Sequence, residues 1–302
     1  MKFIAFEHNG GSSVGILEDG MVADVGELLH DIGRVEYSVD DLLPLIEINV
    51  AERLAGFEMK TVMETGRFVK NLSAVTLRAP IKRPPKIVCV GRNYAEHARE
   101  VKASGGDRDI FTGEGEAPEV PLLFAKAANA VIGPGEKIIR PEDSQELDYE
   151  VELGVVLGKA GFHLTREQAK EHIFGYTVLN DITARDLQRG EKQWYRAKGF
   201  ATFCPIGPAI VTADELDPSD VRLTLSVNGE TRQDSSTSYM ITDVYDLVSI
   251  ISHITPLEPG DLIGTGTPAG VGGFMQPPVF LKSGDVIRAT VDGIGTLENE
   301  VA

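Results

Sequence analysis

The chain has 302 residues, with 29 Lys and Arg against 46 Asp and Glu, which gives a formal net charge of −17. This length suffices for one large domain or two modest ones, and 42% hydrophobic with 25% charged residues is ordinary for a globular protein. The acidic balance argues against nucleic acid or an anionic membrane as the main partner, because their phosphates would be repelled, although a local basic pocket for a small anion stays open.

The two cysteines and the N-terminal residues indicate a reducing compartment. Cys89 lies in an apolar run and Cys204 lies between Phe203 and Pro205, so the chain offers no disulfide framework. Residues 1–10 lack the apolar stretch of a signal peptide, and no segment approaches the roughly 20 apolar residues that span a membrane. We therefore expect a cytoplasmic protein whose partners include neither membrane nor nucleic acid.

The first part of the chain, residues 1–72, is predicted to form a small separate α/β domain. Residues 2–6 and 13–17 are short strand candidates on either side of a turn-rich segment. Residues 39–66 carry apolar side chains at helical spacing, which predicts a helix. Three prolines within residues 79–85 mark the end of this part, because proline removes a hydrogen-bond donor and disfavours helix before it.

The remainder, residues 73–302, is predicted to be β-rich. Short apolar runs between glycines and prolines predict strands at residues 87–91, 122–125, 149–157, 176–182, 209–211, 223–227, 262–265, 286–291 and 296–301. Asn228-Gly229 predicts a hairpin, and helices are expected at residues 94–101, 165–172 and 243–253, the second with a capping box. Because long helices do not alternate with these strands, we expect an α+β, closed or sandwich-like domain rather than a doubly wound parallel sheet.

His97 and Glu100 lie three residues apart in the predicted helix 94–101 and therefore share one helical face. A carboxylate paired with an imidazole orients the ring and raises its basicity, which suits a general base that acts on water. Such pairs are also common on protein surfaces, so a solvated ion pair stays open. The glycine-rich, charged segment 102–118 that follows is of a kind that orders only when substrate binds.

The sharpest feature is the acidic strand 146–158. In an extended strand Asp148, Glu150 and Glu152 point to one face, with successive side chains roughly 7 Å apart, so two carboxylates can converge on one ion. The strand runs on into apolar residues, where carboxylates need a cation to keep their pKa values from rising. A hard divalent cation suits such an all-oxygen set. The alternative is an edge strand with a solvated acidic face.

Asp181 ends the next apolar strand and is a candidate third carboxylate. Arg185 and Gln188 follow within one helical turn and suit a substrate carboxylate, which they would bind by charge and hydrogen bonds. The alternative is a capping asparagine or aspartate, Asn180 or Asp181, with a surface arginine. Lys126 and Lys198 lie in apolar or small surroundings, where each is either a surface lysine or a cation of the site.

Residues 264–273 are rich in glycine but do not predict a nucleotide site. Pro268 and the glycines after it leave no helix whose N-terminus could hold pyrophosphate, and no Gly-Lys-Ser/Thr occurs. The loop can still offer backbone N–H groups and Thr267 to a small anion. The sequence also lacks the Gly-x-Ser-x-Gly turn of a serine hydrolase and any Cys/His cluster with zinc spacing.

Taken together and in this order, these segments resemble the fumarylacetoacetate hydrolase family. The motifs that carry the resemblance lie within residues 75–302 and are GRNYAEHARE, LDYEVELGVVLG, GYTVLNDITARDLQ, KGFATFCPIGP, VNGETRQ and LEPGDLIGTGTPAGVG. The resemblance implies a mixed β-sandwich roll for the catalytic domain, residues 73–302, and a homodimer. Residues 1–72 resemble the variable extra domain of longer bacterial members.

The resemblance also assigns site residues. It implies one divalent cation per subunit, Mg²⁺ or Mn²⁺, bound by Glu150, Glu152 and Asp181. Catalytic roles fall to His97, Glu100 and Lys198. Substrate binding is predicted for five further residues, which are Arg92, Lys126, Arg185, Gln188 and Thr267.

The implied function is that of an enzyme on small 2-oxo (di)carboxylates, in which the cation polarises the 2-oxo group and stabilises an enolate. We expect an acylpyruvate hydrolase or an oxaloacetate decarboxylase/tautomerase, since the intact His97–Glu100 pair favours cleavage of a C–C bond. The alternative is an isomerase or hydratase of 2-hydroxy-diene-dioates, of the 2-hydroxyhepta-2,4-diene-1,7-dioate isomerase type, in aromatic catabolism. A third interpretation, a catalytically silent binding protein, is disfavoured by the complete carboxylate set.

Overall fold

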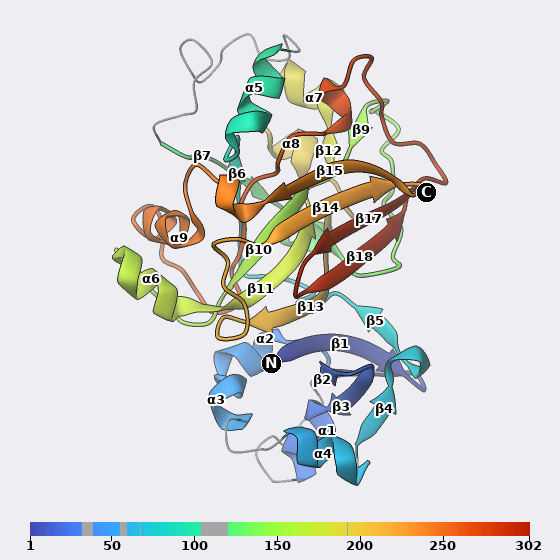
Figure 1. The fold of residues 1–302 in the computed structure, drawn as a ribbon, viewed down its shortest axis with the longest axis vertical. Helices are drawn as coiled ribbons and strands as arrows, with labels where there is room; N and C mark the ends of the chain where they lie inside the picture. Colours follow the sequence, from blue (N-terminus) through green and yellow to red (C-terminus); the bar gives the residue numbers. More distant parts are fainter. Residues whose placement is uncertain (32–38, 55–58, 67, 104–119, 192) are drawn as a thin grey trace.

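The largest element of the fold is a 12-stranded mixed sheet (Figure 1). The computed structural model describes residues 1–302 except 32–38, 55–58, 67, 104–119 and 192, so most of the segment 102–118 lies outside the described residues. The strand order along the main path is β4-β3-β2-β1-β13-β11-β10-β16-β6-β7. Most neighbours are antiparallel, and the predicted β-rich α+β fold is confirmed.

The N-terminal strands continue the main sheet, because β1 pairs antiparallel with β13 (Cys204–Thr212), with Lys2 opposite Val211. These strands are β1 (Lys2–His8), β2 (Gly11–Glu18), β3 (Met21–Asp24), β4 (Val69–Asn71) and β5 (Thr76–Arg78). The helices packed on them are α1 (Val25–Asp31), α2 (Leu43–Glu47), α3 (Val50–Leu54) and α4 (Met59–Thr65). The division into domains at residues 72 and 73 stays a prediction.

The segment 39–66, expected to be helical, contains helices but not one continuous helix. The chain forms α2, α3 and α4 there instead. Asn49, between α2 and α3, has a left-handed backbone conformation with φ of 54°, which a continuing helix does not allow. The apolar residues of this segment nevertheless pack together in the core, since Leu42, Ile46 and Leu54 are all buried in one cluster.

The remaining strands of the main sheet include those that carry the site. They are β6 (Ile87–Gly91), β7 (Leu122–Lys126), β8 (Val131–Ile132), β10 (Val151–Leu157), β11 (Ile173–Asn180) and β16 (Leu262–Gly264). Strand β10 lies between β11 and β16, and each of its residues is buried. The alternative of an edge strand with a solvated acidic face is therefore wrong. The strand also begins at Val151, two residues later than expected.

A second sheet of four strands packs against the main sheet. Its strands are β14 (Arg222–Val227), β15 (Glu230–Ser236), β17 (Val286–Val291) and β18 (Gly295–Glu300), in the order β15-β14-β17-β18. Leu153 and Val178 of the main sheet share one buried cluster with Leu225 and Ala289 of the second sheet, so the two sheets enclose the core. The predicted Asn228-Gly229 hairpin is confirmed, with φ of 51° and 83°.

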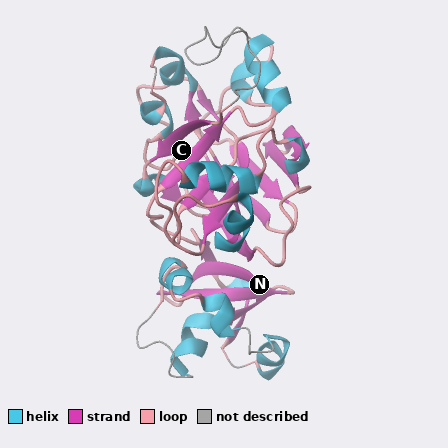
Figure 2. Cartoon of the chain, turned by 90° about the vertical axis from the view of Figure 1, so that its left-hand side faces the viewer, coloured by secondary structure: helices cyan, strands magenta, loops and turns pink. Residues whose placement is uncertain are grey.

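Further helices and short strands surround this sandwich, as Figure 2 shows from the side. The helices are α5 (Ala95–Ala103), α6 (Arg166–His172), α7 (Arg185–Gly190), α8 (Tyr195–Lys198) and α9 (Val244–Ser252), and the strands are β9 (Leu147–Asp148) and β12 (Thr183–Ala184). The expected capping box at Thr165 and Gln168 is confirmed at the start of α6. Helices α5, α7 and α8 gather at the end of the molecule that lies away from the N-terminal strands (Figure 1). Among the described residues, every helix is too short or too polar to cross a membrane.

Candidate active site

Three carboxylates from two neighbouring strands meet in the interior. Because β10 and β11 are antiparallel, with Val151 opposite Asn180, the residue before β10 lies beside the residue after β11. The Asp181 backbone N–H donates to the Glu150 carbonyl over 2.8 Å. One oxygen each of Glu150, Glu152 and Asp181 lies within 4.8 Å of the others, and all three side chains are buried. The structure thus brings together the three residues predicted to bind a metal.

Two buried lysines neutralise part of this cluster. Lys198 Nζ lies 2.7 Å from Glu150 Oε2 and 2.6 Å from Asp181 Oδ2. Lys126 Nζ lies 2.5 Å from Asp181 Oδ1, behind that carboxylate. Burial by itself lowers the pKa of Lys198, but the neighbouring Asp181 and Glu150 carboxylates outweigh it and hold the pKa above its ordinary value. The surface-lysine interpretation is therefore wrong for both residues.

Glu150 and Glu152 differ sharply in their electrostatic surroundings. Burial raises the pKa of Glu150, but Lys198 and Arg185 outweigh it, so that this pKa falls below its ordinary value. Burial raises the pKa of Glu152 well above its ordinary value, and the neighbouring Asp181 and Glu150 charges raise it further. Glu152 Oε2 is buried and has no hydrogen-bond partner among the described residues. Glu152 is the carboxylate of the cluster that needs a cation most.

The donor set fits a hard divalent cation. Four buried carboxylates, those of Asp148, Glu150, Glu152 and Asp181, are in contact with or close to three cationic side chains, those of Lys126, Lys198 and Arg185. With all four carboxylates ionised, this set carries one more negative than positive charge, and the oxygen without a partner is Glu152 Oε2. Carboxylate oxygens are the ligands that Mg²⁺ and Mn²⁺ prefer.

Arg185, the first residue of α7, holds the carboxylates in place. Its Nε lies 2.8 Å from Asp148 Oδ2 and its Nη2 lies 2.5 Å from Glu150 Oε1. Its Nη1 donates to Gln188 Oε1 over 3.0 Å, which orients that amide at the pocket. Arg185 is buried, so the alternative of a surface arginine is wrong.

His97 and Glu100 lie on α5, opposite the carboxylates. His97 Nδ1 lies 3.2 Å from Glu100 Oε2, and the histidine is only 5% exposed, which rules out a solvated surface pair. Glu100 also accepts the Gly270 backbone N–H, at 3.1 and 3.2 Å from its two oxygens. The ring of Phe274 packs on His97 with the centroids 5.8 Å apart. The imidazole is thus fixed on two sides.

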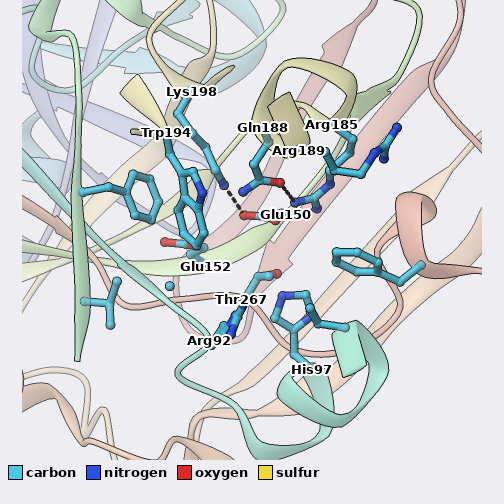
Figure 3. A pocket seen from close by; sticks show the side chains of 15 residues that line it. Arg92, His97, Glu150, Glu152, Arg185, Gln188, Arg189, Trp194, Lys198 and Thr267 are labelled. Carbon is cyan, nitrogen blue, oxygen red and sulfur yellow. Dashed lines mark hydrogen bonds and ion pairs between the residues drawn. The ribbon is translucent and has the colours of Figure 1, made fainter. Parts of the chain in front are cut away.

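One pocket joins these groups (Figure 3). The predicted site residues that line it are Arg92, His97, Glu150, Glu152, Arg185, Gln188, Lys198 and Thr267. Asp181 and Glu100 contact the lining residues Lys198 and His97. Figure 3 shows His97 and Arg92 on one side of the pocket, with Glu150, Lys198 and Gln188 across from them.

The pocket also contains residues that sequence reasoning did not assign. Arg189 directly follows Gln188, and Trp194 is the only tryptophan of the chain. Phe124 packs on Trp194 with a centroid distance of 5.4 Å, and Lys198 Nζ lies 4.9 Å from the Phe124 ring centroid. The sequence marks these residues only by their position next to the assigned motifs, because residues of a pocket wall follow no fixed spacing along the chain.

Thr267 is held from the second sheet. Its hydroxyl donates to the Val151 carbonyl over 2.9 Å and accepts from Gln233 Nε2 over 2.8 Å. Gln233, on β15, also accepts the Val151 N–H through its Oε1. In the described part of the chain, the short 3₁₀ helix Gly272–Phe274 follows Thr267.

Comparisons with known proteins agree with this geometry. The family described as fumarylacetoacetate (FAA) hydrolase C-terminal matches residues 86–302. Oxaloacetate tautomerase YisK of Bacillus subtilis (strain 168) is 40% identical over 310 residues, which cover 100% of both chains. The mitochondrial oxaloacetate tautomerase FAHD2A of Bos taurus is 45% identical over 232 residues, which cover 76% of this chain and 70% of the relative.

Solved structures are also similar over the whole chain. A fumarylacetoacetate hydrolase (EaFAH) from Exiguobacterium antarcticum is 41% identical, with a TM-score of 0.81 over 100% of this chain and 99% of that one. A 2-hydroxyhepta-2,4-diene-1,7-dioate isomerase from Mycobacterium marinum is 32% identical, with a TM-score of 0.74 over 100% and 98%. A maleylpyruvate hydrolase from Sphingobium sp. SYK-6, in complex with manganese(II) and pyruvate, is 28% identical, with a TM-score of 0.76 over 100% and 99%.

Proposed function

This chain belongs to the fumarylacetoacetate hydrolase family of enzymes, and we propose that it is an oxaloacetate tautomerase, which interconverts the enol and keto forms of that 2-oxo dicarboxylate. One observation carries the proposal: the imidazole of His97, fixed by Glu100, lies across a single pocket from the buried carboxylates Glu150 and Glu152. The choice of oxaloacetate rests on the full-length similarity to YisK.

The proposed enzyme uses one Mg²⁺ or Mn²⁺ per subunit, held by Glu150, Glu152 and Asp181. Support comes from the buried, unpartnered oxygen of Glu152 and from the manganese(II) and pyruvate in the related maleylpyruvate hydrolase structure. When bound, such a cation polarises the 2-oxo group and stabilises negative charge on its oxygen. With a divalent cation bound and all four carboxylates ionised, the cluster would carry one excess positive charge, which suits an anionic substrate.

Tautomerisation moves a proton between C3 of the substrate and the oxygen on C2. Because His97 Nδ1 is engaged by Glu100, the other ring nitrogen, Nε2, is the one that takes the proton from C3 and delivers it to the oxygen on C2, and that carries it back in the reverse direction. The Glu100 carboxylate stabilises the imidazolium that forms when His97 holds this proton. Lys198, Gln188 and Arg92 line the pocket and supply donors for the substrate carboxylates. Phe124 and Trp194 pack together and form an apolar wall of the pocket.

Cleavage of a C–C bond is the second candidate. The same His97–Glu100 pair suits activation of a water molecule against a distal carbonyl, as acylpyruvate hydrolysis requires. Similarity to the maleylpyruvate hydrolase supports this candidate. Decarboxylation of oxaloacetate needs no such water, since CO₂ leaves and the enolate is then protonated. Isomerisation of 2-hydroxy-diene-dioates is a third possibility, supported by the similarity to the 2-hydroxyhepta-2,4-diene-1,7-dioate isomerase.

We also propose that the protein is a cytoplasmic homodimer with a small N-terminal domain, residues 1–72, and a catalytic domain, residues 73–302. The dimer rests on the family resemblance, and its mass in solution by light scattering tests it directly. Proteolysis tests the division, which requires a preferred cleavage region between the two proposed domains. A monomer or a chain without such a region would contradict these two proposals.

The test of function is a substrate panel with a metal-stripped enzyme. The loss of enol absorbance of oxaloacetate is followed after EDTA treatment and after addition of Mg²⁺ or Mn²⁺, with metal and buffer alone as the blank. Maleylpyruvate, acetylpyruvate and a 2-hydroxy-diene-dioate are assayed in parallel, and pyruvate release reports decarboxylation. We expect metal-dependent tautomerisation to be fastest. Activity that survives EDTA on every substrate would refute the metal requirement, and faster pyruvate release from any substrate would make C–C cleavage the main reaction.

A further inference from the structure

The segment of residues 270–274 lies between the two halves of the proposed active site. On one side, the Gly270 N–H donates to Glu100, and the Phe274 ring packs on His97 with a centroid distance of 5.8 Å. On the other side, the guanidinium of Arg185 lies 5.2 Å from the Phe274 ring centroid. This segment therefore contacts both the proton-transfer pair and the arginine that holds Glu150.

Asp148 holds this segment through two hydrogen bonds from the segment's backbone. Its side chain is fully buried, and its Oδ1 accepts the Gly272 N–H and its Oδ2 the Gly273 N–H, each over 2.8 Å. The same Oδ2 lies 2.8 Å from Arg185 Nε. One carboxylate thus ties the segment to Arg185, and through Arg185 Nη2 to Glu150.

The fit of the segment is close. A Cβ atom on Gly272 would lie 2.0 Å from the Val279 carbonyl oxygen and 2.9 Å from Asp148 Oδ1. A Cβ atom on Gly273 would lie 3.1 Å from both Asp148 Oδ2 and Arg185 Cγ. At position 272 only glycine fits, because a Cβ atom would overlap the Val279 carbonyl oxygen, and at position 273 a Cβ atom would be tightly placed against Asp148 and Arg185.

We propose that Asp148 is a positioning residue, which acts on the reaction through His97. Its carboxylate fixes residues 270–274, and these set the place of His97 and Glu100 relative to Glu150. The proposal rests on the proposed function in so far as His97 transfers the proton. The physical reason is geometric, because a displacement of about 1 Å between reacting groups lowers a rate by up to about 100-fold.

The kinetic test is a double-mutant cycle between Asp148→Asn and His97→Ala. Asparagine keeps one acceptor oxygen but removes the charge and the second acceptor. We expect D148N to lower kcat for tautomerisation about tenfold or more when His97 is present, and less than about twofold in the H97A background. An equal loss of kcat in both backgrounds would overturn the proposal, because Asp148 would then act independently of His97.

A matched control separates positioning from stability. Asp261 is 1% exposed and, like Asp148, accepts two backbone N–H groups, those of Lys86 and Glu258, and a cationic side chain, that of Lys86. Asp261→Asn is expected to lower the Tm but to leave kcat and KM unchanged. A loss of kcat in D261N as large as that in D148N, at a similar loss of Tm, would assign the effect of Asp148 to stability and overturn the proposal.

A spectroscopic readout does not depend on activity. The ring current of Phe274 affects the His97 ring protons, whose NMR resonances are assigned by their loss in H97A. We expect these resonances to shift in D148N and to stay in place in D261N, and an unchanged His97 resonance in D148N would overturn the proposal. If the wild-type enzyme converts no oxaloacetate, the proposed function fails while this measurement still decides the positioning role.

A second variant covers the case in which D148N does not fold. Phe274→Leu removes the ring contact with His97 from the side of the segment and leaves the Asp148 hydrogen bonds intact. We expect F274L to lower kcat about tenfold when His97 is present and less than about twofold in the H97A background. An F274L enzyme with wild-type kcat would show that the segment does not set the position of His97, and the proposal would fall.

Discussion

Gly264 lies directly beneath Glu152: a Cβ atom on Gly264 would lie 2.4 Å from Glu152 Oε2. The same atom would lie 3.1 Å from Cys89 Sγ. Strand β16 pairs with β10 so that Gly264 opposes Gly154, and Glu152 bends over the strand into the space that a side chain would need. The glycine that ends β16 therefore shapes the proposed metal site without contributing a ligand.

Gly264→Ala is predicted to weaken metal binding. The added methyl group displaces Glu152, which is buried and has little room to move. We expect the Mn²⁺ dissociation constant, measured by isothermal titration calorimetry, to rise about tenfold or more. Gly11→Ala, in strand β2, is the matched control, because its Cβ would meet only the His8 carbonyl oxygen at 3.7 Å. Unchanged Mn²⁺ affinity in G264A would show that Glu152 is not a ligand.

Glu152→Gln and Glu150→Gln are predicted to change the stability of the metal-free protein in opposite directions. Glu152 is a buried carboxylate whose pKa is raised by burial, so the neutral amide should raise the Tm. Glu150 contacts Lys198 and Arg185, so its loss leaves buried cations without a partner and should cost about 3 kcal/mol or more of unfolding free energy.

Calorimetry in EDTA and in Mn²⁺ tests this pair of variants. Wild-type protein should gain stability from Mn²⁺, because a ligand that binds only the folded state raises the Tm. Both variants should lose most of this gain. A metal-free E152Q protein with a lower Tm than wild type would contradict the electrostatic account of Glu152, and a full Mn²⁺ response after loss of both glutamates would place the metal elsewhere.

His97→Ala is predicted to lower kcat for tautomerisation about 100-fold or more, because general acid–base catalysis contributes rate factors of this size. Glu100→Gln should lower kcat less, since the amide still contacts His97 but no longer stabilises its charged form. Steady-state kinetics at saturating metal measures both effects. Full tautomerase activity in H97A, together with loss of maleylpyruvate hydrolysis, would show that His97 does not transfer the proton in tautomerisation.

Asp243→Asn is predicted to lower stability at neutral pH and not at acid pH. Asp243 caps α9, where its Oδ1 accepts the Tyr245 and Asp246 N–H groups and lies 2.5 Å from Arg166 Nη1. Burial raises the pKa of Asp243, but the hydrogen bond from Arg166, the backbone N–H groups and the Arg166 charge outweigh it, so the pKa lies below its ordinary value of 3.8. The charge therefore stabilises the fold above about pH 3.8, and this contribution disappears as the pH falls through the lower folded pKa.

The measurement is the unfolding free energy of wild type and D243N from pH 7 down to pH 3. Asparagine is as good an N-cap as aspartate, so the difference isolates the charge and should be about 0.5 kcal/mol at pH 7. Asp19→Asn, at an exposed turn, is the control for the loss of a surface carboxylate. A D243N deficit that stays constant down to pH 3 would contradict the prediction.

Local spacing along the chain determines much of the site. Period-two alternation places Glu152 of β10 and Glu150, directly before this strand, on one side, and Val151 and Leu153 in the core on the other. The three-residue spacing of His97 and Glu100 places the imidazole against the carboxylate on α5. Both relations follow from backbone geometry within a single element, so the sequence alone is enough to predict them.

Only the tertiary structure decided which carboxylate has a cation. Lys198 reaches Glu150 over 48 residues of sequence and Asp181 over 17, while Glu152 Oε2, two residues from Glu150, has no partner among the described residues. The contact of Asp148 with Gly272 and Gly273 spans more than 120 residues. Such pairings depend on strand register and on the packing of separate elements, which no local spacing encodes, and the net charge of −17 gave no sign of the three cations buried around these carboxylates.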